Sequence, residues 1–334
     1  MSFIQKTREP VFTIICPVFN SGKFLNNTVQ SVLRQTFNLW QLILVNDGST
    51  DNSKSICDYY SNLDSRITVI HKNNQGQSLA RIDGIKIAKG EYIVFLDSDD
   101  DFKTNELEIL NETIKKTGCN MVLFNGTKLD ELSDSPVYNE LVEKTITDSP
   151  DIISECFLSK VAGYLWTYCI KRELFTINEQ NLKYYCHLKY SEDMFLIYSI
   201  LSEKKITLRV LKDQLYLYHI RSNSLSQNQT FNRLKDRFMV YDKIYSSISK
   251  KYAEKFKNID KKVSENVGWV TLSLIYHSGK ELTYAQFKEE ILEIKKTFSF
   301  THMINFKKDR FNKILRIFIK LGLYRQCYKI IKAH

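Results

Sequence analysis

Four short apolar runs in the first hundred residues each end in polar residues and are separated by segments with helical periodicity. The runs are rich in β-branched and aromatic residues, which is typical of strands buried on both faces of a parallel sheet. Between the first two runs, apolar positions recur at helical spacing from Phe24 to Leu33. The alternation predicts a Rossmann-like, mostly parallel α/β sheet with flanking helices. The four runs are residues 12–20, 41–46, 67–71 and 92–96.

The chain after the fourth run is less regular. A helix is predicted at 107–116 and a strand at 120–124, whereas residues 128–150 are polar, short of core residues and predicted to be irregular. From Asn232 onward the pattern is helical throughout.

These patterns predict two parts. The first is an α/β domain over residues 1–228, with halves at about 11–102 and 103–228. The second is a helical region over residues 229–334, for which the sequence indicates no role.

The net charge of +10 lies in the C-terminal part of the chain. From residue 295 to the end, eleven Lys or Arg stand against one acid, so this segment carries +10 and the preceding residues sum to zero. A neutral body with a basic tail argues against a nucleic-acid-binding protein. A last helix predicted over 306–332 is amphipathic, as in helices that lie on anionic membranes and in packed helices with solvated charges. Its apolar side holds Phe311, Ile314, Leu315, Phe318 and Leu321, and its basic side Lys313, Arg316 and Lys320.

Composition narrows the cellular setting. No apolar stretch approaches the ~20 residues that a membrane-spanning helix needs, and residues 1–10 lack the apolar run of a secretory signal. The seven cysteines include no Cys-x-x-Cys pair, which favours reduced thiols in the cytoplasm.

An acidic cluster, Asp97-Ser98-Asp99-Asp100-Asp101, follows the fourth run directly. Carboxylates at the end of a buried strand suit Mg²⁺ or Mn²⁺, which usually share their coordination shell with substrate phosphates. A solvated acidic turn that caps the next helix is the alternative. A calcium loop is excluded by Phe102, which stands where that loop needs glycine.

Several ordered motifs together resemble the nucleotide-sugar-binding half of family 2 glycosyltransferases, which have the GT-A fold. The resemblance covers the first third of the chain closely and continues more loosely to about Ser224. Asn46 and Ile82 depart from the family pattern, since many members have aspartate and asparagine there. The motifs are Pro-Val-Phe-Asn (17–20), Gln-Thr-Phe (35–37), Val-Asn-Asp-Gly-Ser-Thr-Asp (45–51), Asn-Gln-Gly-Gln-Ser-Leu-Ala-Arg (74–81), Ala-Lys-Gly-Glu-Tyr (88–92) and Phe-Leu-Asp-Ser-Asp-Asp (95–100).

The resemblance implies roles on the donor side. Asp99 would bind the metal and Arg81 would face the diphosphate. Asp47 would accept a hydrogen bond from uracil, and Phe19 would line the uracil pocket, although a core role for Phe19 is equally compatible with the sequence. The implied nucleotide-binding set is Pro17, Phe19, Asn20, Asp47, Arg81, Asp97 and Ser98.

The resemblance also implies residues on the acceptor side. Asp193 matches the family's catalytic base, with Glu192 in support, although two acids that begin a helix are often only favourable charges there. Trp166 would stack on an acceptor sugar or belong to the core. The segment 216–225 resembles the family's closing loop, and its candidate diphosphate contacts are Arg221, Ser224 and His219.

The predicted function is therefore that of an inverting, metal-dependent glycosyltransferase. It would move galactose, glucose or an N-acetylhexosamine from a UDP-sugar to a hydroxyl of a growing glycan on lipid, polysaccharide or glycoprotein. The predicted cofactor is Mn²⁺ or Mg²⁺, and the predicted location is the cytoplasm, at the inner face of the membrane if the last helix binds lipid. The alternatives are a nucleotidyltransferase, whose usual Gly-rich phosphate loop is absent after the first strand, and an inactive glycosyltransferase-like binding subunit.

Overall fold

The chain forms two compact units in the computed structural model. The structure describes residues 9–130, 133–138, 141–153, 156, 163–176, 181, 185–221, 230–252, 259–297, 299–300, 303 and 310–333. The first unit comprises Met1–Glu155, Val161–His187 and Leu196–Ser222, and the second comprises Cys156–Lys160, Leu188–Phe195 and Asn223–His334. The predicted boundary between residues 228 and 229 lies outside the described residues and stays a prediction.

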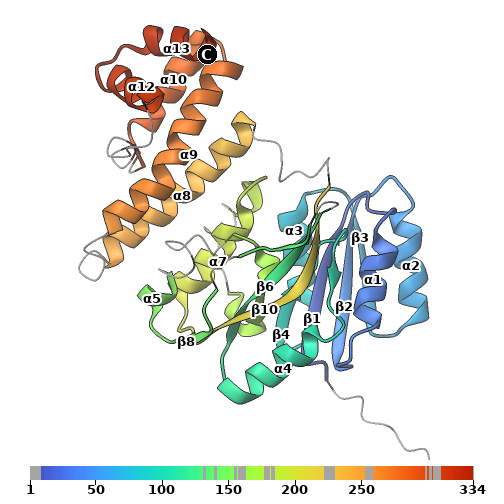
Figure 1. The fold of residues 1–334 in the computed structure, drawn as a ribbon. Coiled ribbons are helices and arrows are strands. Elements are labelled where there is room, and N and C mark those ends of the chain that lie inside the picture. The colour runs from blue at the N-terminus through green and yellow to red at the C-terminus, as the bar shows by residue number, and fades with distance from the viewer. Residues whose placement is uncertain are drawn as a thin grey trace, which may run out of the picture. The chain divides into compact units, whose positions relative to one another are not determined.

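The first unit is built on a mixed sheet. The described strands run in the order β3-β2-β1-β4-β9-β6-β10-β5, with β7 paired to β6 and β8 paired to β10 (Figure 1). Strands β3, β2, β1 and β4 are mutually parallel, and β9 lies antiparallel between β4 and β6. The strands are β1 (Phe12–Val18), β2 (Trp40–Asp47), β3 (Ile67–Lys72), β4 (Tyr92–Phe95), β5 (Asp101–Phe102), β6 (Met121–Leu129), β7 (Ser135–Pro136), β8 (Lys144–Ile146), β9 (Tyr168–Lys171) and β10 (Leu208–His219).

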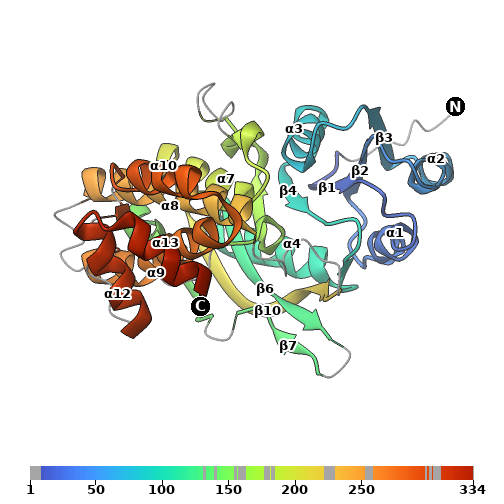
Figure 2. The same cartoon turned by 90° about the horizontal axis from the view of Figure 1, so that it is seen from above.

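Helices cover both faces of the parallel part of this sheet. Figure 2 shows α3 on one side of β1 and β2, and α1 and α2 on the other. Both faces of β1, β2 and β4 are buried, which is why these strands read as unbroken apolar runs. The helices of this unit are α1 (Leu25–Leu33), α2 (Ser53–Leu63), α3 (Gln77–Ile87), α4 (Glu106–Thr117), α5 (Ser149–Ile153), most of α7 (Glu192–Glu203) and the 3₁₀ turns η2 (Leu165–Thr167) and η3 (Arg172–Leu174).

The sheet order creates a topological switch point. The chain runs outward from β1 through β2 to β3, and β4 then returns to the opposite edge of β1. The carboxyl ends of β1 and β4 therefore border the crevice where open α/β sheets bind ligands. The four strands predicted in the first hundred residues are confirmed, and with them the predicted α/β class.

Residues 128–150 are more regular than predicted. Strand β6 continues to Leu129, and the short strands β7 and β8 and the helix α5 follow. Strand β8 pairs with the beginning of β10, which also pairs with β6 along most of its length. Strands of two or three residues depend on such partners and carry no periodicity of their own, so the prediction of irregular structure was wrong here.

The second unit is helical and has its own core. It contains the first turn of α7 and the helices α8 (Phe231–Tyr252), α9 (Ile259–Glu281), α10 (Tyr284–Ile294), α12 (Arg310–Lys320) and α13 (Tyr324–Ala333). Thr283 and Gln286 form a capping box at the start of α10. The buried core includes Leu234, Phe238, Leu274, Phe287, Ile291, Leu315, Ile319, Cys327 and Ile331.

The single last helix predicted over 306–332 is two helices in the described part of the chain. Gly322 adopts a φ of 75° between α12 and α13. Its N–H donates to the carbonyl of Ile319, and the N–H of Leu323 donates to that of Phe318, at 3.2 and 2.8 Å. These two bonds form a Schellman motif, which ends α12 at a position where glycine avoids backbone strain. The prediction overlooked this glycine stop.

Glu106, the first residue of α4, is buried without compensation. Its side chain is fully buried, and neither carboxylate oxygen has a hydrogen-bonding partner among the described residues. Burial raises the pKa of Glu106 well above its ordinary value of 4.5, because desolvation penalises the charged form. The folded protein therefore keeps a carboxyl proton that the unfolded chain loses near pH 4.5.

This difference predicts that Glu106→Gln flattens the dependence of stability on pH. Above pH 4.5 the folded wild type binds one proton more than its unfolded chain, so its stability falls as pH rises. The loss is up to about 1.4 kcal/mol per pH unit until the raised folded pKa is reached. Urea unfolding at pH 5, 6, 7 and 8 measures it, and the advantage of the variant should grow with pH. Glu112→Gln, on the exposed side of the same helix, is the control. Parallel curves for wild type and Glu106→Gln would contradict the prediction.

Candidate functional site

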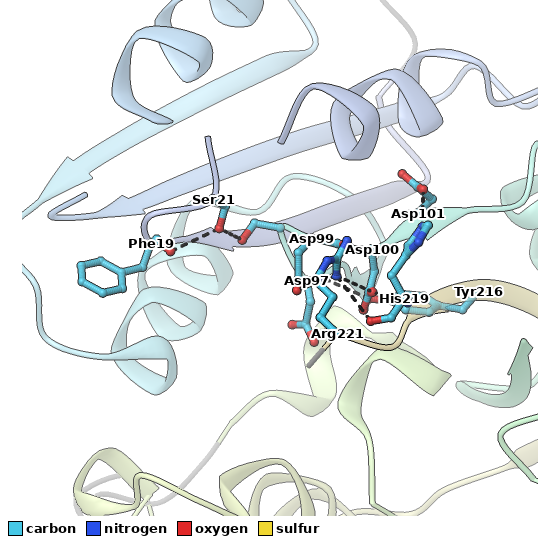
Figure 3. A network of polar contacts seen from close by, with 10 residues as sticks. Phe19, Ser21, Asp97, Asp99, Asp100, Asp101, Tyr216, His219 and Arg221 are labelled. Atoms are coloured by element: carbon cyan, nitrogen blue, oxygen red, sulfur yellow. Dashed lines mark hydrogen bonds and ion pairs between the residues drawn. The ribbon is translucent and has the colours of Figure 1, made fainter. Parts of the chain in front are cut away.

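Polar residues after β1 and β4 meet at the switch point of the sheet. Ser21 follows β1 and Ser98 follows β4, and their hydroxyl oxygens lie 2.6 Å apart (Figure 3). Ser21 also donates through its hydroxyl to the carbonyl of Phe19, at 3.2 Å. These bonds tie the ends of two parallel strands together and fix the start of the acidic cluster, Asp97 to Asp101.

Asp97 is held by residues of α3 and β10. Its Oδ1 accepts hydrogen bonds from Gln77 Nε2 at 3.1 Å and Arg81 Nη2 at 3.4 Å, and its backbone N–H donates to Tyr216 Oη at 3.1 Å. The guanidinium of Arg81 is 2% exposed, so it supports Asp97 from within the protein. The predicted position of Arg81 beside the diphosphate stays a prediction.

Asp99 is paired with Arg221, which follows β10. Nη1 of Arg221 donates to Asp99 Oδ2 at 2.8 Å, and Nη2 donates to the main-chain carbonyl of Asp99 (Figure 3). The guanidinium also lies 4.0 Å from the centroid of the Phe24 ring, near enough for a cation–π contact. The Asp99 side chain is 44% exposed, the most open of the cluster's paired carboxylates.

Asp100 and Asp101 anchor the cluster to β10. Asp100, which is 1% exposed, accepts from Tyr216 Oη and from the backbone N–H of His219, both at 2.9 Å. Burial, and then the charges of Asp97 and Asp99, raise the pKa of Asp100 well above its ordinary value. Asp101 Oδ2 lies 2.7 Å from His219 Nε2. His219 is thus a partner of the acidic cluster, and its side chain is 34% exposed.

The acidic cluster is therefore a fixed loop. Its four carboxylates all have partners outside the cluster, and residues 101–102 form a strand that pairs with β10. The next helix, α4, begins only at Glu106. A solvated turn that caps this helix, the alternative left open by the sequence, is excluded.

A second polar loop lies at the end of β2. Asp47 is 2% exposed, and its two oxygens accept from the backbone N–H groups of Gln75 and Gly76 at 2.9 and 2.8 Å. A nucleobase bound at this loop would share the carboxylate oxygens of Asp47 with these two backbone N–H groups. Phe19 lies on the loop after the neighbouring strand β1 and is 51% exposed, whereas Pro17 is buried within β1. Phe19 therefore presents an aromatic surface and is not a core residue.

Asn20 shapes the loop after β1. It is one of two described non-glycine residues with positive φ, at 50°, and the other is Ser191 at 60°. Asn20 Oδ1 accepts from the backbone N–H of Thr50 at 2.8 Å, and the Asn20 N–H donates to Ser49 Oγ at 3.0 Å. Left-handed backbone at such residues costs free energy and is concentrated at functional sites.

Asp97 and Asp99 fit a divalent cation only in company with a ligand. Their carboxylates, on residues separated by Ser98, are 26% and 44% exposed and supply the hard oxygen atoms that Mg²⁺ and Mn²⁺ prefer. Among the described residues, no three His, Cys, Asp or Glu side chains are arranged to hold a metal ion. The described residues thus offer an incomplete coordination shell, which phosphate oxygens and water would complete.

Asp193 and Glu192 form the first turn of α7, in the second unit. Ser191, with its positive φ, turns the chain into this helix. Just before it, the backbone N–H groups of Lys189 and Tyr190 both donate to Asp236 Oδ2 on α8, at 3.0 and 3.1 Å. The segment that carries Asp193 is thus fastened to α8.

Trp166 is a buried tryptophan. It is 3% exposed and stacks with Tyr164, Tyr216 and Tyr218, at centroid distances of 5.1, 4.1 and 5.8 Å. Tyr164, at 39% exposure, is the open member of this stack, so it and not Trp166 offers an aromatic face to solvent. The burial matches the core alternative for Trp166. Ser224 lies outside the described residues.

Sequence reasoning missed four residues that support candidate site residues: Gln77, Asp100 and Tyr216 in the first unit and Asp236 in the second. Gln77 stood inside a recognised motif and could have been proposed as a polar partner of the acidic cluster. Asp100 and Tyr216 are 116 positions apart, and their contact depends on how β5 and β10 pair. Asp236 lies in a helix with ordinary amphipathic spacing, so nothing in its surroundings distinguishes it.

Comparison with known proteins gives three findings. The sequence model described as Glycosyl transferase family 2 matches residues 13–131. Glycosyltransferase GlyG of Streptococcus pneumoniae serotype 4 is 32% identical over 231 residues, which are 66% of this chain and 74% of GlyG. The crystal structure of S. aureus TarS residues 1–349 in complex with UDP-GlcNAc superposes with a TM-score of 0.69 at 19% identity, covering 96% of this chain and 90% of that one. The predicted GT-A fold is thereby confirmed.

Proposed function

The chain belongs to glycosyltransferase family 2, and we propose that it transfers a hexose from a UDP-sugar to a hydroxyl of a growing bacterial surface glycan. The sugar would be galactose, glucose or an N-acetylhexosamine, and the acceptor a polysaccharide, lipid or protein-bound glycan. The observation that carries the proposal is the fixed acidic loop at the switch point, with the Asp97 and Asp99 carboxylates partly exposed, at 26% and 44%. UDP-GlcNAc in the TarS complex supports a UDP-sugar donor.

On the donor side, Phe19 would stack on uracil, since its ring is exposed beside the switch point. Asp47 would accept from the base while it holds the loop at Gly76. Arg221 would bind the diphosphate, as a guanidinium matches phosphate oxygens well. Asp99 would hold Mn²⁺ or Mg²⁺, whose charge offsets that of the departing UDP. The mannosyltransferase PcManGT of Pyrobaculum calidifontis was solved in complex with GDP-Man and Mn²⁺. It superposes with a TM-score of 0.54 at 13% identity, and the match covers 98% of this chain and 87% of PcManGT.

On the acceptor side, Asp193 would accept the proton of the attacking hydroxyl as its oxygen bonds to the anomeric carbon. Attack from the face opposite the departing UDP inverts that carbon. Glu192, next in the first turn of α7, would add negative charge, and Ser191 would orient the turn. Tyr164 offers an exposed aromatic face for a sugar ring.

A screen of UDP-sugars tests the proposal. Purified protein should hydrolyse one UDP-sugar slowly without acceptor and release UDP, and EDTA should stop the release. Release of pyrophosphate from a nucleoside triphosphate would instead indicate the nucleotidyltransferase. Binding of UDP without turnover of any UDP-sugar, with or without glycan acceptors, would indicate the inactive binding subunit.

The proposal includes peripheral contact with an anionic membrane through the C-terminal helices. Helices α12 and α13 contain seven Lys or Arg and no acid. Part of the predicted apolar side faces the core of the second unit, because Leu315 is buried there and Phe311 and Phe318 pack against that core. Ile317 and Leu321 remain 46% and 65% exposed. We call the exposed group Lys313, Ile317, Lys320, Leu321 and Arg325 the basic corner. The structure has no helix, within its described ranges, that is long and apolar enough to span a bilayer.

Removing charge from the basic corner should weaken binding to anionic vesicles. Each Lys near such a surface contributes about 1 kcal/mol, so the double variant Lys313→Gln, Lys320→Gln should lower partitioning roughly thirtyfold. Ile317→Ser with Leu321→Ser should also lower it, whereas Leu292→Ser, exposed on α10, should not. Co-sedimentation with phosphatidylglycerol vesicles over a salt series measures this. If wild type fails to sediment at low salt, the packed-helix alternative stands.

A further inference from the structure

We infer that Arg221 competes with the divalent cation for Asp99, and that the donor's diphosphate relieves this competition by drawing Arg221 onto itself. The inference rests on the proposed function, because it concerns the same cation and nucleotide site. It assigns to Arg221 two successive partners, Asp99 before the nucleotide binds and the diphosphate afterwards.

The fit between Arg221 and Asp99 is close. One guanidinium nitrogen donates to Oδ2 of Asp99 at 2.8 Å, and another donates to its main-chain carbonyl. The same Nη1 lies 3.9 Å from Asp100 Oδ1, and the Phe24 ring supports the guanidinium face at 4.0 Å. Arg221 is only 22% exposed, so this contact is screened less than a fully exposed ion pair. Arg221 therefore lies where its positive charge opposes a cation at Asp99.

Two positive groups on one carboxylate repel each other. A Mn²⁺ or Mg²⁺ ion at Asp99 would share the carboxylate with the guanidinium or displace it, and either course weakens cation binding through repulsion between the two positive charges. A diphosphate removes the conflict, because its several anionic oxygens can bind Arg221 and the cation at different atoms. By linkage, UDP must then strengthen cation binding as much as the cation strengthens UDP binding.

The alternative is that Arg221 only orients Asp99 for the cation. The two roles predict opposite signs for the same measurement. If Arg221 is a competitor, its removal strengthens cation binding in the absence of nucleotide. If it is a support, its removal weakens that binding, because the Asp99 carboxylate loses its orientation.

The test is a Mn²⁺ titration of the full chain without nucleotide, with free Mn²⁺ read by electron paramagnetic resonance. Arg221→Gln should bind Mn²⁺ about fivefold more tightly than wild type, the factor expected for about 1 kcal/mol from one partly exposed ion pair. Arg221→Lys keeps the positive charge but loses the planar guanidinium, and its Mn²⁺ affinity should lie between those of wild type and Arg221→Gln. Arg66→Gln is the matched control, since Arg66 also pairs with an aspartate, Asp64, and stacks on an aromatic ring, that of Trp40. Its affinity should equal that of wild type.

A second titration with saturating UDP measures the linkage. The gain in Mn²⁺ affinity caused by UDP should be smaller in Arg221→Gln than in wild type, because no arginine remains to be released. Unchanged or weaker Mn²⁺ binding by Arg221→Gln without nucleotide overturns the inference, and so does the absence of Mn²⁺ binding by both proteins. Failure of the proposed function would give a different result. Wild type would then bind no UDP at any Mn²⁺ concentration, whatever Mn²⁺ affinity Arg221→Gln shows without nucleotide.

Discussion

Asp193→Asn should lower the rate of glycosyl transfer by roughly 10²–10⁴ while UDP-sugar affinity stays near that of wild type. Asparagine keeps the size and polarity of the side chain but cannot take the proton from the acceptor hydroxyl. In the proposed site other residues, at the ends of β1, β2 and β4, would bind the donor, so its affinity should not depend on this carboxylate. Calorimetry with UDP and a transfer assay with the sugar found in the screen measure the two quantities separately.

Neighbouring variants make this prediction specific. Asp193→Glu should recover little activity, because a carboxylate displaced by even ~1 Å spoils the geometry of attack. Glu192→Gln is the matched control, in the same helical turn, and should be milder. If Glu192→Gln were inactive and Asp193→Asn retained transfer, the base would be Glu192.

Asp99→Asn should abolish the part of UDP binding that EDTA removes from wild type. A neutral amide oxygen is a much poorer ligand for Mn²⁺ or Mg²⁺ than a carboxylate, and the cation is worth several kcal/mol to a diphosphate. We therefore expect UDP affinity in the presence of Mn²⁺ to fall by about 10²-fold or more. The fold should survive, since Asp99 is 44% exposed and its neighbours keep their own partners.

Calorimetry of UDP with Mn²⁺ and with EDTA checks this expectation. Wild type should lose affinity in EDTA, and Asp99→Asn should bind UDP weakly and equally in both buffers. Asp58→Asn is the control, because Asp58 is another exposed carboxylate with one charged or polar partner, His71, away from the switch point. If Asp99→Asn bound UDP as tightly as wild type, and lost this on adding EDTA, the cation would be held elsewhere.

Much of the first unit could be predicted from the sequence, because its information is local. The strands β1, β2 and β4 are buried on both faces, so each appears as an apolar run that ends at a polar loop. The acidic cluster could be found for the same reason, since the end of β4 and the start of the cluster are adjacent.

What the sequence could not indicate depends on pairing between distant segments. Tyr216 reads as one more aromatic in a strand, and only the pairing of β5 with β10 brings its hydroxyl to Asp100. Arg81 lies in a motif whose resemblance implies a phosphate contact, and its burial and its contact with Asp97 could not be inferred from that motif. The contact between Arg221 and Asp99 could not be inferred from the sequence either. The resemblance gives each residue a separate role at the diphosphate, a phosphate contact for Arg221 and the metal for Asp99.

The hydrogen bond between the Tyr190 N–H and Asp236 affects where this chain can be joined to a relative in a chimera. The short segment 188–195 belongs to the second unit, although the segments on both sides of it belong to the first unit. The two units therefore alternate along the chain. A crossover placed after β10 would exchange Asp236 while leaving Asp193 behind, and the N–H groups of Lys189 and Tyr190 would lose their acceptor. Chimeras that swap the C-terminal helices between relatives are therefore expected to keep UDP binding but lose transfer, unless residues 188–195 travel with them.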